Sequence, residues 1–250
     1  MLRIGRKRDT AAILSASYTD IGGREDNEDC VQIVTADGGS LCCVVADGLG
    51  GHGGGQVASQ TAVRLICANW RPGDGAEKLS ALLQEAHEAV LERQAQFRSA
   101  MKTTAVVLSV CARRAAWAHA GDSRLYRFDG GRLAFQTRDH SLPQIAVQLG
   151  EITGDQIRFH PDRNRVLRAL GQNGELNVTT GEAELERGRH AFLLCSDGFW
   201  EYVYEDEMAG ELRDASDPGD WLRRMRRHIA ERAGGADSDN NTAAAVWVDI

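Results

Sequence analysis

The chain has 250 residues, of which 42% are apolar and 26% charged, a composition typical of a globular protein large enough to bury a core. Its formal net charge of -7 argues against a nucleic-acid-binding surface, which requires clustered lysine and arginine. No stretch approaches the ~20 consecutive apolar residues of a membrane-spanning helix. We therefore expect one soluble domain over residues 1–250, with no nucleic-acid or membrane partner.

The N-terminus combines basic residues with a short apolar run, as a secretory signal peptide does. Ser15 and Ser17 interrupt that run and an acidic segment follows directly, so we favour a cytoplasmic location. The six cysteines include no Cys-x-x-Cys pair and mostly lie in apolar runs. They predict reduced core thiols rather than zinc ligands or disulfides.

The first clear strand is followed by a glycine-rich segment that allows two interpretations. Residues 41–46 predict a buried strand, and residues 56–70 have the apolar spacing of a helix. Between them, Gly48 to Gly53 matches the G-x-G-x-x-G pattern of dinucleotide-binding proteins. That fold needs a parallel strand directly after the helix, and a P-loop needs Lys followed by Ser or Thr. Residues 77–98 instead predict a second helix, packed on the first as a hairpin, which disfavours both nucleotide sites.

Strand signals dominate the middle of the chain, at 103–112, 115–122 and 123–137. Residues 140–171 are less regular, and predict one short helix after Pro143 and otherwise an excursion over the surface.

The C-terminal part predicts a strand over 190–195, a helix from Asp217 to Gly234 and a final strand over 242–250. Asp217 is the expected helix cap and Pro218 the first helical residue.

Aspartate recurs at the ends of the predicted strands. Asp47, Asp122 and Asp197 each follow an apolar strand, and Asp239 precedes the last one. One such residue usually marks a turn. Four of them, with Glu28-Asp29 upstream, would repel one another unless a cation neutralised them. Hard oxygen ligands of this kind suit Mg²⁺ or Mn²⁺.

The sequence resembles the metal-dependent, PPM-type (type 2C) protein phosphatases, which hydrolyse phosphoserine and phosphothreonine. The resemblance covers nearly the whole chain and is carried by eight short segments in order: Arg24-x-x-Asn27-Glu28-Asp29, Asp47-Gly48-x-Gly50-Gly51, Thr103-Thr104, Gly121-Asp122-Ser123-Arg124, Asp139-His140-Ser141, Arg168-Ala169-Leu170-Gly171, Ser196-Asp197-Gly198 and Asp239-Asn240-x-Thr242. It implies an α+β fold, a four-layer αββα sandwich of two antiparallel sheets flanked by antiparallel helix pairs. Residues 140–171 would form a flap-like excursion.

The resemblance also implies a dinuclear centre of Mn²⁺ or Mg²⁺. Asp47 would bridge two tightly bound cations. Glu28 and the carbonyl of Gly48 would bind one of them, and Asp197 would bind the other together with Asp239. Two cations ~3.5–4 Å apart lower the pKa of a shared water and neutralise phosphoryl oxygens during in-line attack.

Four further residues would complete this site. Asp29 and Asn240 would lie behind the ligands, with Asp29 holding metal-bound waters. Arg24 would bind the substrate phosphate, because its planar fork matches phosphate oxygens, and the alternative is a free arginine in a surface turn. Asp122 matches the position that helps bacterial members hold a third, weaker metal, and the alternative is a cap on the turn that follows it.

The sequence departs from the family pattern at three places. Leu49 stands where many eukaryotic members have a histidine proposed as general acid, so the leaving group must be protonated otherwise. Lys102 replaces the glycine usual before Thr103-Thr104, and the segment from Asp20 to Arg24 is about one residue shorter than the pattern. No departure removes a metal ligand.

The resemblance implies a bacterial stand-alone serine/threonine phosphatase domain, a cytoplasmic monomer that acts on phosphorylated proteins and opposes a Ser/Thr kinase encoded elsewhere. The alternative is a catalytically inactive relative that binds phosphoproteins, but such a relative should lack ligand carboxylates that this chain retains. His52, His140 and His160 are expected to be structural or exposed rather than metal ligands.

Overall fold

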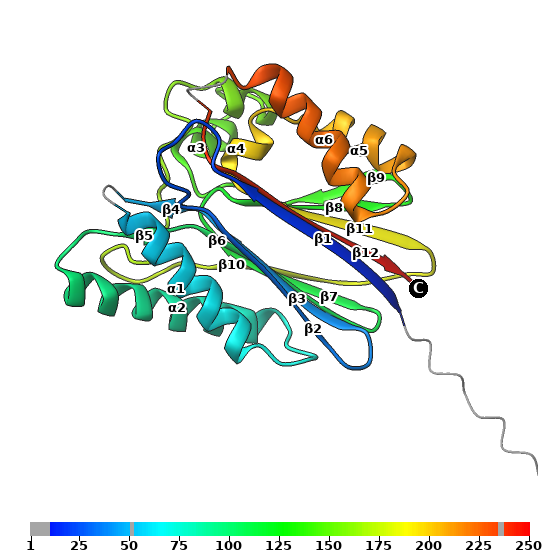
Figure 1. Cartoon of the computed structure of the whole chain (residues 1–250), viewed down its shortest axis with the longest axis horizontal. Helices are drawn as coiled ribbons and strands as arrows, with labels where there is room; N and C mark the ends of the chain where they lie inside the picture. Colours follow the sequence, from blue (N-terminus) through cyan, green and yellow to red (C-terminus); the bar gives the residue numbers. More distant parts are fainter. Residues whose placement is uncertain (1–10, 51–52, 235–237) are drawn as a thin grey trace, which may run out of the picture.

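The structure is a computed structural model that describes residues 11–50, 53–234 and 238–250. Two five-stranded antiparallel sheets lie face to face, and a pair of helices covers the outer face of each (Figure 1). The predicted four-layer αββα sandwich is therefore confirmed.

Each sheet is built from strands that are distant in the chain. The first sheet has the order β1-β12-β11-β8-β9, with the bounds Ala12–Asp20, Asn241–Asp249, Arg189–Cys195, Arg124–Asp129 and Arg132–Gln136. The second has the order β10-β7-β6-β3-β2, with the bounds Thr179–Glu184, Arg114–Ala120, Ala105–Cys111, Ser40–Ala46 and Cys30–Ala36. A small separate ladder pairs β4 (Gly48–Leu49) with β5 (Lys102–Thr103).

The helices pair as the sequence predicts. Helices α1 (Gly54–Asn69) and α2 (Ala76–Phe97) form the hairpin on the second sheet. On the first sheet lie α5 (Glu205–Asp214) and α6 (Pro218–Arg232), and the side chain of Asp217 caps α6 by accepting a hydrogen bond from the Asp220 N–H at 2.8 Å. Among the described residues no helix has both the length and the apolar character needed to cross a bilayer.

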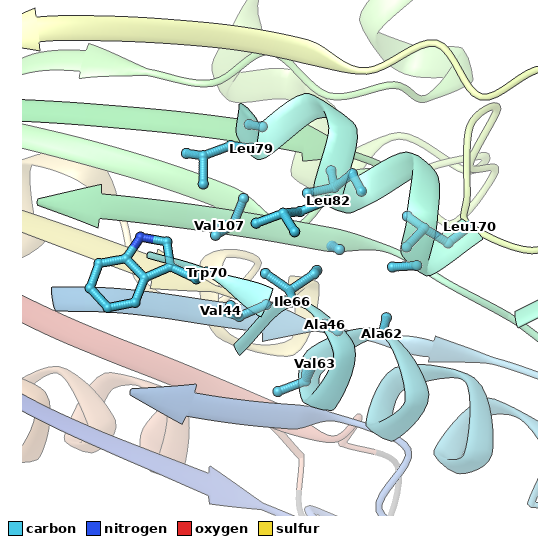
Figure 2. Close-up of a cluster of buried hydrophobic side chains, with 14 of the residues drawn as sticks. Val44, Ala46, Ala62, Val63, Ile66, Trp70, Leu79, Leu82, Val107 and Leu170 are labelled. Atoms are coloured by element: carbon cyan, nitrogen blue, oxygen red, sulfur yellow. The ribbon is translucent and has the colours of Figure 1, made fainter. Parts of the chain in front are cut away.

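Three apolar layers hold these elements together. One joins α1 and α2 to the second sheet, where Ile66 and Leu82 pack against Val44 and Val107 (Figure 2). A second fills the space between the sheets, and a third lies under α5 and α6. All six cysteines are free thiols, four buried and two half-buried, as predicted.

Residues 140–171 contain two short helices and a few buried anchor residues. They contain the expected short helix, α3 (Leu142–Gln148), with Pro143 in its first turn, and an additional 3-10 helix over Gly154–Phe159. The side chain of Ile157 is buried, and Arg158 binds both carboxylate oxygens of Glu205 at 2.6 and 2.8 Å. The segment therefore runs over the surface as expected for most of its length, and these contacts dock it on α5.

Candidate active site

The strand order brings the predicted ligand carboxylates to one edge of the sandwich. Strands β3 and β7 both pair antiparallel with β6, so they run in the same direction and end at the same edge. Asp47 and Asp122 follow these two ends. In the other sheet β11 and β12 are antiparallel, so Asp197 after β11 lies beside Asp239 before β12. The polar residues thus meet where apolar strands stop.

A cavity of about 660 Å³ opens at this edge. It is lined by every residue that the sequence assigns to the metals or the phosphate except Asp29: Arg24, Glu28, Asp47, Gly48, Asp122, Asp197, Asp239 and Asn240. The lining also includes polar and apolar side chains that the sequence did not single out, namely Glu25, Asp26, Asn164 and Val166. The first two lie between Arg24 and Glu28, which was an available signal, whereas no pattern marks the two from the irregular segment.

The carboxylates of the cavity are crowded, and the side chain of Asp122 is also buried. Burial, and then the neighbouring Asp197, raises the pKa of Asp47 well above its usual range, and the same two causes raise the pKa of Asp122. Burial also raises the pKa of Asp197 to about 6 and that of Asp29 to about 7. Such groups retain protons unless a cation offsets their charge.

Asp47 is fixed by the two threonines that open the next strand. Its N–H donates to the Thr104 hydroxyl at 3.0 Å, and its carbonyl accepts from the Thr104 N–H at 2.8 Å. The Thr103 hydroxyl donates to the same carbonyl at 2.9 Å. These bonds account for the Thr-Thr pair within the family pattern and leave the Asp47 carboxylate to the cavity.

The glycines allow helix α1 to approach Glu28 closely. The Gly55 N–H donates to the Glu28 carboxylate at 3.1 Å, and the Gly48 N–H donates to its carbonyl at 3.1 Å. A Cβ on Gly48 would lie 2.2 Å from the Gly55 carbonyl oxygen, and one on Gly55 would lie 2.6 Å from the Glu28 carboxyl carbon. The glycine run therefore serves close packing around a carboxylate, and the dinucleotide pattern is coincidental.

Asn240 ties the loop after β1 to the start of β12. Its side-chain oxygen accepts from the Glu28 N–H at 2.8 Å, and its amide nitrogen donates to the carbonyls of Ile21 and Asp26 at 2.8 and 3.0 Å. Asn240 thus holds the loop that carries Arg24 and Glu28.

Asp29 is buried behind the cavity. Its Oδ2 accepts from the Ser196 hydroxyl at 2.7 Å, while its buried Oδ1 has no hydrogen-bond partner among the residues that the structure describes. An acceptor in this state fits a site where solvent or a hydrated ion supplies the missing donor.

Arg24 lies at the rim with its Nη2 2.8 Å from Oδ2 of Asp239. The residues predicted to bind phosphate and metal therefore bind each other in this structure.

Two of the three departures from the family pattern, Leu49 and Lys102, lie side by side. Leu49 lines the cavity and is paired with Lys102 across the β4–β5 ladder.

His140 stacks on His119 and His160 accepts a local hydrogen bond from the Asp162 N–H, so both are structural as expected. His52 lies outside the described residues.

The cavity fits divalent cations by its chemistry. All of its candidate ligands offer oxygen, the donor that Mg²⁺ and Mn²⁺ prefer. No three histidine, cysteine or acidic side chains within the described ranges already form a coordination cluster. Arg24 pairs with Asp239, which offsets the charge of one of these carboxylates.

The chain is similar in sequence to known protein phosphatases. The family model described as protein phosphatase 2C matches residues 20–237. The serine/threonine phosphatase stp of Listeria monocytogenes is 35% identical over 203 residues, 78% of this chain and 77% of that protein. Protein phosphatase PhpP of Streptococcus pneumoniae is 30% identical over 237 residues, 91% of this chain and 94% of that protein.

Two solved structures match nearly the whole chain. The Mycobacterium tuberculosis serine/threonine phosphatase PstP/Ppp superposes with a TM-score of 0.83 and 29% identity, covering 95% of this chain and 99% of that one. The catalytic domain of serine/threonine protein phosphatase PstP in complex with two manganese ions has a TM-score of 0.82 and 28% identity, covering 96% and 100%.

Proposed function

This chain belongs to the protein phosphatase 2C family, and on that premise we propose that its acidic cavity binds two divalent cations and hydrolyses phosphoserine and phosphothreonine in proteins. Membership makes the protein a hydrolase and a serine/threonine phosphatase. The observation that carries the finer proposal is the convergence of four strand-end aspartates and Glu28 on one cavity with Arg24 at its rim.

The ligand roles follow the family resemblance. Asp47 would bridge both cations. Glu28 and the Gly48 carbonyl would hold one cation, and Asp197 would hold the other with Asp239. When bound, such cations lower the pKa of a water molecule and offset the charge of the phosphoryl oxygens. The relative solved with two manganese ions supports Mn²⁺ as one suitable metal, and the oxygen donors suit Mg²⁺ equally.

A third, weaker cation would be bound by Asp122. This carboxylate lines the same cavity from the end of β7, and its pKa is raised by burial and then by Asp197. A site with fewer ligand charges binds its cation less tightly.

The remaining residues would orient the substrate and solvent. Arg24 would leave Asp239 and bind the phosphate through its planar fork. Asp29 would accept a hydrogen bond from solvent at its unpartnered Oδ1. Leu49 has no proton to give, so the proton for the leaving hydroxyl comes from another group.

We further propose phosphorylated proteins as substrates, a cognate Ser/Thr kinase as the opposing enzyme, and a cytoplasmic monomer as the active form. The competing function is a catalytically inactive phosphoprotein-binding module. The full set of carboxylates on the cavity favours the enzyme, because an inactive module needs none of them.

A phosphatase assay separates the two functions. The purified protein should hydrolyse p-nitrophenyl phosphate and phosphothreonine peptides with Mn²⁺ or Mg²⁺, and lose this activity in EDTA. Readdition of the metal should restore it. Full activity after exhaustive chelation would contradict the metal mechanism, and peptide binding without turnover at saturating metal would favour the inactive module.

A further inference from the structure

We propose that His140 is a positioning residue that fastens the turn carrying Asp122 to the base of the segment 140–171. This inference rests on the proposed role of Asp122 as the ligand of a weak cation. It assigns a task to a histidine that touches neither the cavity nor a substrate.

His140 holds Gly121, the residue before Asp122, at two points. The His140 N–H donates to the Gly121 carbonyl at 2.9 Å, and the Gly121 N–H donates to the imidazole Nδ1 at 3.2 Å. The main chain of Gly121 is thereby satisfied entirely by one residue. No other side chain in the described ranges bonds to this peptide.

The same histidine joins the two strands of chain at the base of the segment 140–171. It is the first residue of the segment, and its carbonyl accepts from the Leu167 N–H of the returning chain at 2.7 Å. One residue further, the Leu142 N–H donates to the Arg165 carbonyl at 3.0 Å. His140 therefore links the outgoing chain, the returning chain and the Asp122 turn.

The imidazole is held in the form that this link requires. Accepting from Gly121 leaves Nδ1 without a proton, so the neutral ring carries its proton on Nε2, 2.8 Å from the Thr179 hydroxyl. Burial, and then the neighbouring His119, lowers the pKa of His140 to about 3, which keeps the ring neutral. The ring stacks on His119 with centroids 4.6 Å apart and planes 8° from parallel.

The rest of the turn is fixed by side chains of other elements. Trp200 Nε1 donates to the Asp122 carbonyl at 3.0 Å, the Ser123 and Thr104 hydroxyls lie 2.6 Å apart, and Arg124 binds Asp139 at 2.7 and 2.8 Å. None of these partners belongs to the segment 140–171. Arg158 of that segment reaches the turn indirectly, through Trp200, whose carbonyl accepts from Arg158 Nη1 at 2.6 Å. His140 is thus the residue through which the segment bonds directly to the turn that carries Asp122.

The two imidazole nitrogens can be tested separately with two amides. In His140→Asn the amide oxygen takes the place of Nδ1 and can still accept from Gly121. In His140→Gln the longer side chain takes the place of Nε2 and keeps only the Thr179 contact. Thr179→Val is the matched control, because it removes the Nε2 partner and leaves Gly121 untouched.

Five quantities should be measured for each variant. They are the Mn²⁺ concentration for half-maximal hydrolysis of p-nitrophenyl phosphate, kcat, KM, the melting temperature, and the rate of tryptic cleavage within residues 160–168 in EDTA. We expect His140→Gln to lower kcat or raise the Mn²⁺ requirement about tenfold, as substitutions of residues that hold a metal ligand in place commonly do. KM should be unchanged, and tryptic cleavage should be faster. His140→Asn and Thr179→Val should resemble wild type.

The inference is overturned if His140→Gln matches His140→Asn in metal requirement, kcat and cleavage, or if Thr179→Val reproduces the defect. It is also overturned if the loss in His140→Gln accompanies only a lower melting temperature, with unchanged Mn²⁺ requirement and cleavage. Inactivity of the wild type with Mn²⁺ would instead count against the proposed function, and the cleavage comparison would still test the link between His140 and the segment.

Discussion

The guanidinium of Arg24 binds the carboxylate of Asp239 at 2.8 Å, across 215 residues of chain. Both side chains are largely accessible, with 55% and 37% of their surface exposed. An exposed pair of this kind contributes about 0–1 kcal/mol. A phosphate on Arg24 and a cation on Asp239 can therefore separate the two residues at little cost, and the pair is compatible with both proposed roles.

Removing Arg24 should weaken substrate binding. If Arg24 binds the phosphate in the ground state and the transition state alike, Arg24→Ala should raise KM at least as much as it lowers kcat. Arg24→Lys should fall between Ala and wild type, because Lys keeps the charge but loses the planar fork. Steady-state kinetics with a phosphopeptide at two Mn²⁺ concentrations measures this. Rescue of Arg24→Ala by extra Mn²⁺ would show that Arg24 acts on the metal instead.

Asp47→Asn and Asp239→Asn should each abolish turnover while the protein stays folded. Each substitution removes a ligand charge and therefore releases metal. Retention of more than about a tenth of wild-type kcat at saturating metal, which is ~1.4 kcal/mol of barrier at most, would mean that the residue is not a ligand. Thermal unfolding in EDTA is the control. In EDTA the Asp47→Asn variant should melt no lower than wild type. Burial and the neighbouring Asp197 raise the pKa of Asp47, so the ionised carboxylate is unfavourable in the metal-free protein.

Asp122→Ala should behave differently from Arg24→Ala. Asp122 is proposed to hold only the weak cation, so kcat should fall and the activity should shift towards higher Mn²⁺ concentration, with KM nearly unchanged. Titration of the variant with Mn²⁺ and with phosphopeptide separately gives the answer. A loss confined to substrate affinity would exclude the metal role.

Metal binding should release protons near neutral pH. Burial raises the pKa of Asp29 to about 7 and that of Asp197 to about 6, so the metal-free protein is partly protonated there. A bound cation favours the ionised forms and expels these protons, so the apparent Mn²⁺ affinity should rise as pH rises from 6 to 8. Calorimetry at pH 7 in buffers of different ionisation enthalpy counts the protons. Asp29→Asn should release fewer, and equal heats in all buffers would contradict the prediction.

The buried pair of Arg124 and Asp139 should matter for stability. Both side chains are 2% exposed and bind at 2.7 and 2.8 Å, with Arg124 also stacked 3.6 Å above Trp200. Asp139→Ala would remove the bidentate partner of a buried charge and leave it only the more distant Glu205 carboxylate at 3.7 Å. It should lower the free energy of unfolding by about 3–5 kcal/mol.

The matched control is the surface pair of Arg189 and Asp249, which are 53% and 40% exposed. There Asp249→Ala should cost at most about 1 kcal/mol. Urea unfolding in EDTA measures both variants, and similar losses would mean that burial does not set the value of the Arg124 pair.

The sequence predicts the elements that carry their own apolar pattern and misses those that depend on a partner. Strand β3 is entirely apolar, and α6 has a proline, a cap and a periodic face, so both were predicted closely. Strand β10 reads Thr-Thr-Gly-Glu-Ala-Glu and is a strand only because it pairs with β7 at the edge of the sheet. Strand β1 was interpreted only as an apolar N-terminal run, because its pairing with β12 joins opposite ends of the chain.

The same limit applies to the site. Aspartate after an apolar strand is visible in sequence, so Asp47, Asp122 and Asp197 were found, and the family pattern placed Glu28 among them. The Arg24–Asp239 pair and the hold of Asn240 on Ile21 join residues more than 200 positions apart. Neither leaves a local signal, because the register of β1 on β12 creates both contacts.

The site is divided between the two sheets, so the spacing between the sheets also sets the separation of the carboxylates. Asp47 and Asp122 extend from one sheet, Asp197 and Asp239 from the other, and the layer between them contains fully buried side chains such as Val45. Packed interiors do not absorb a change of even one methylene without a shift. Such a shift would move Asp47 and Asp122 relative to the aspartates of the other sheet, and catalysis tolerates little displacement of the reacting groups. Buried side chains between the sheets, which contact neither solvent nor substrate, therefore set the distance between the two pairs of aspartates on which the proposed turnover depends.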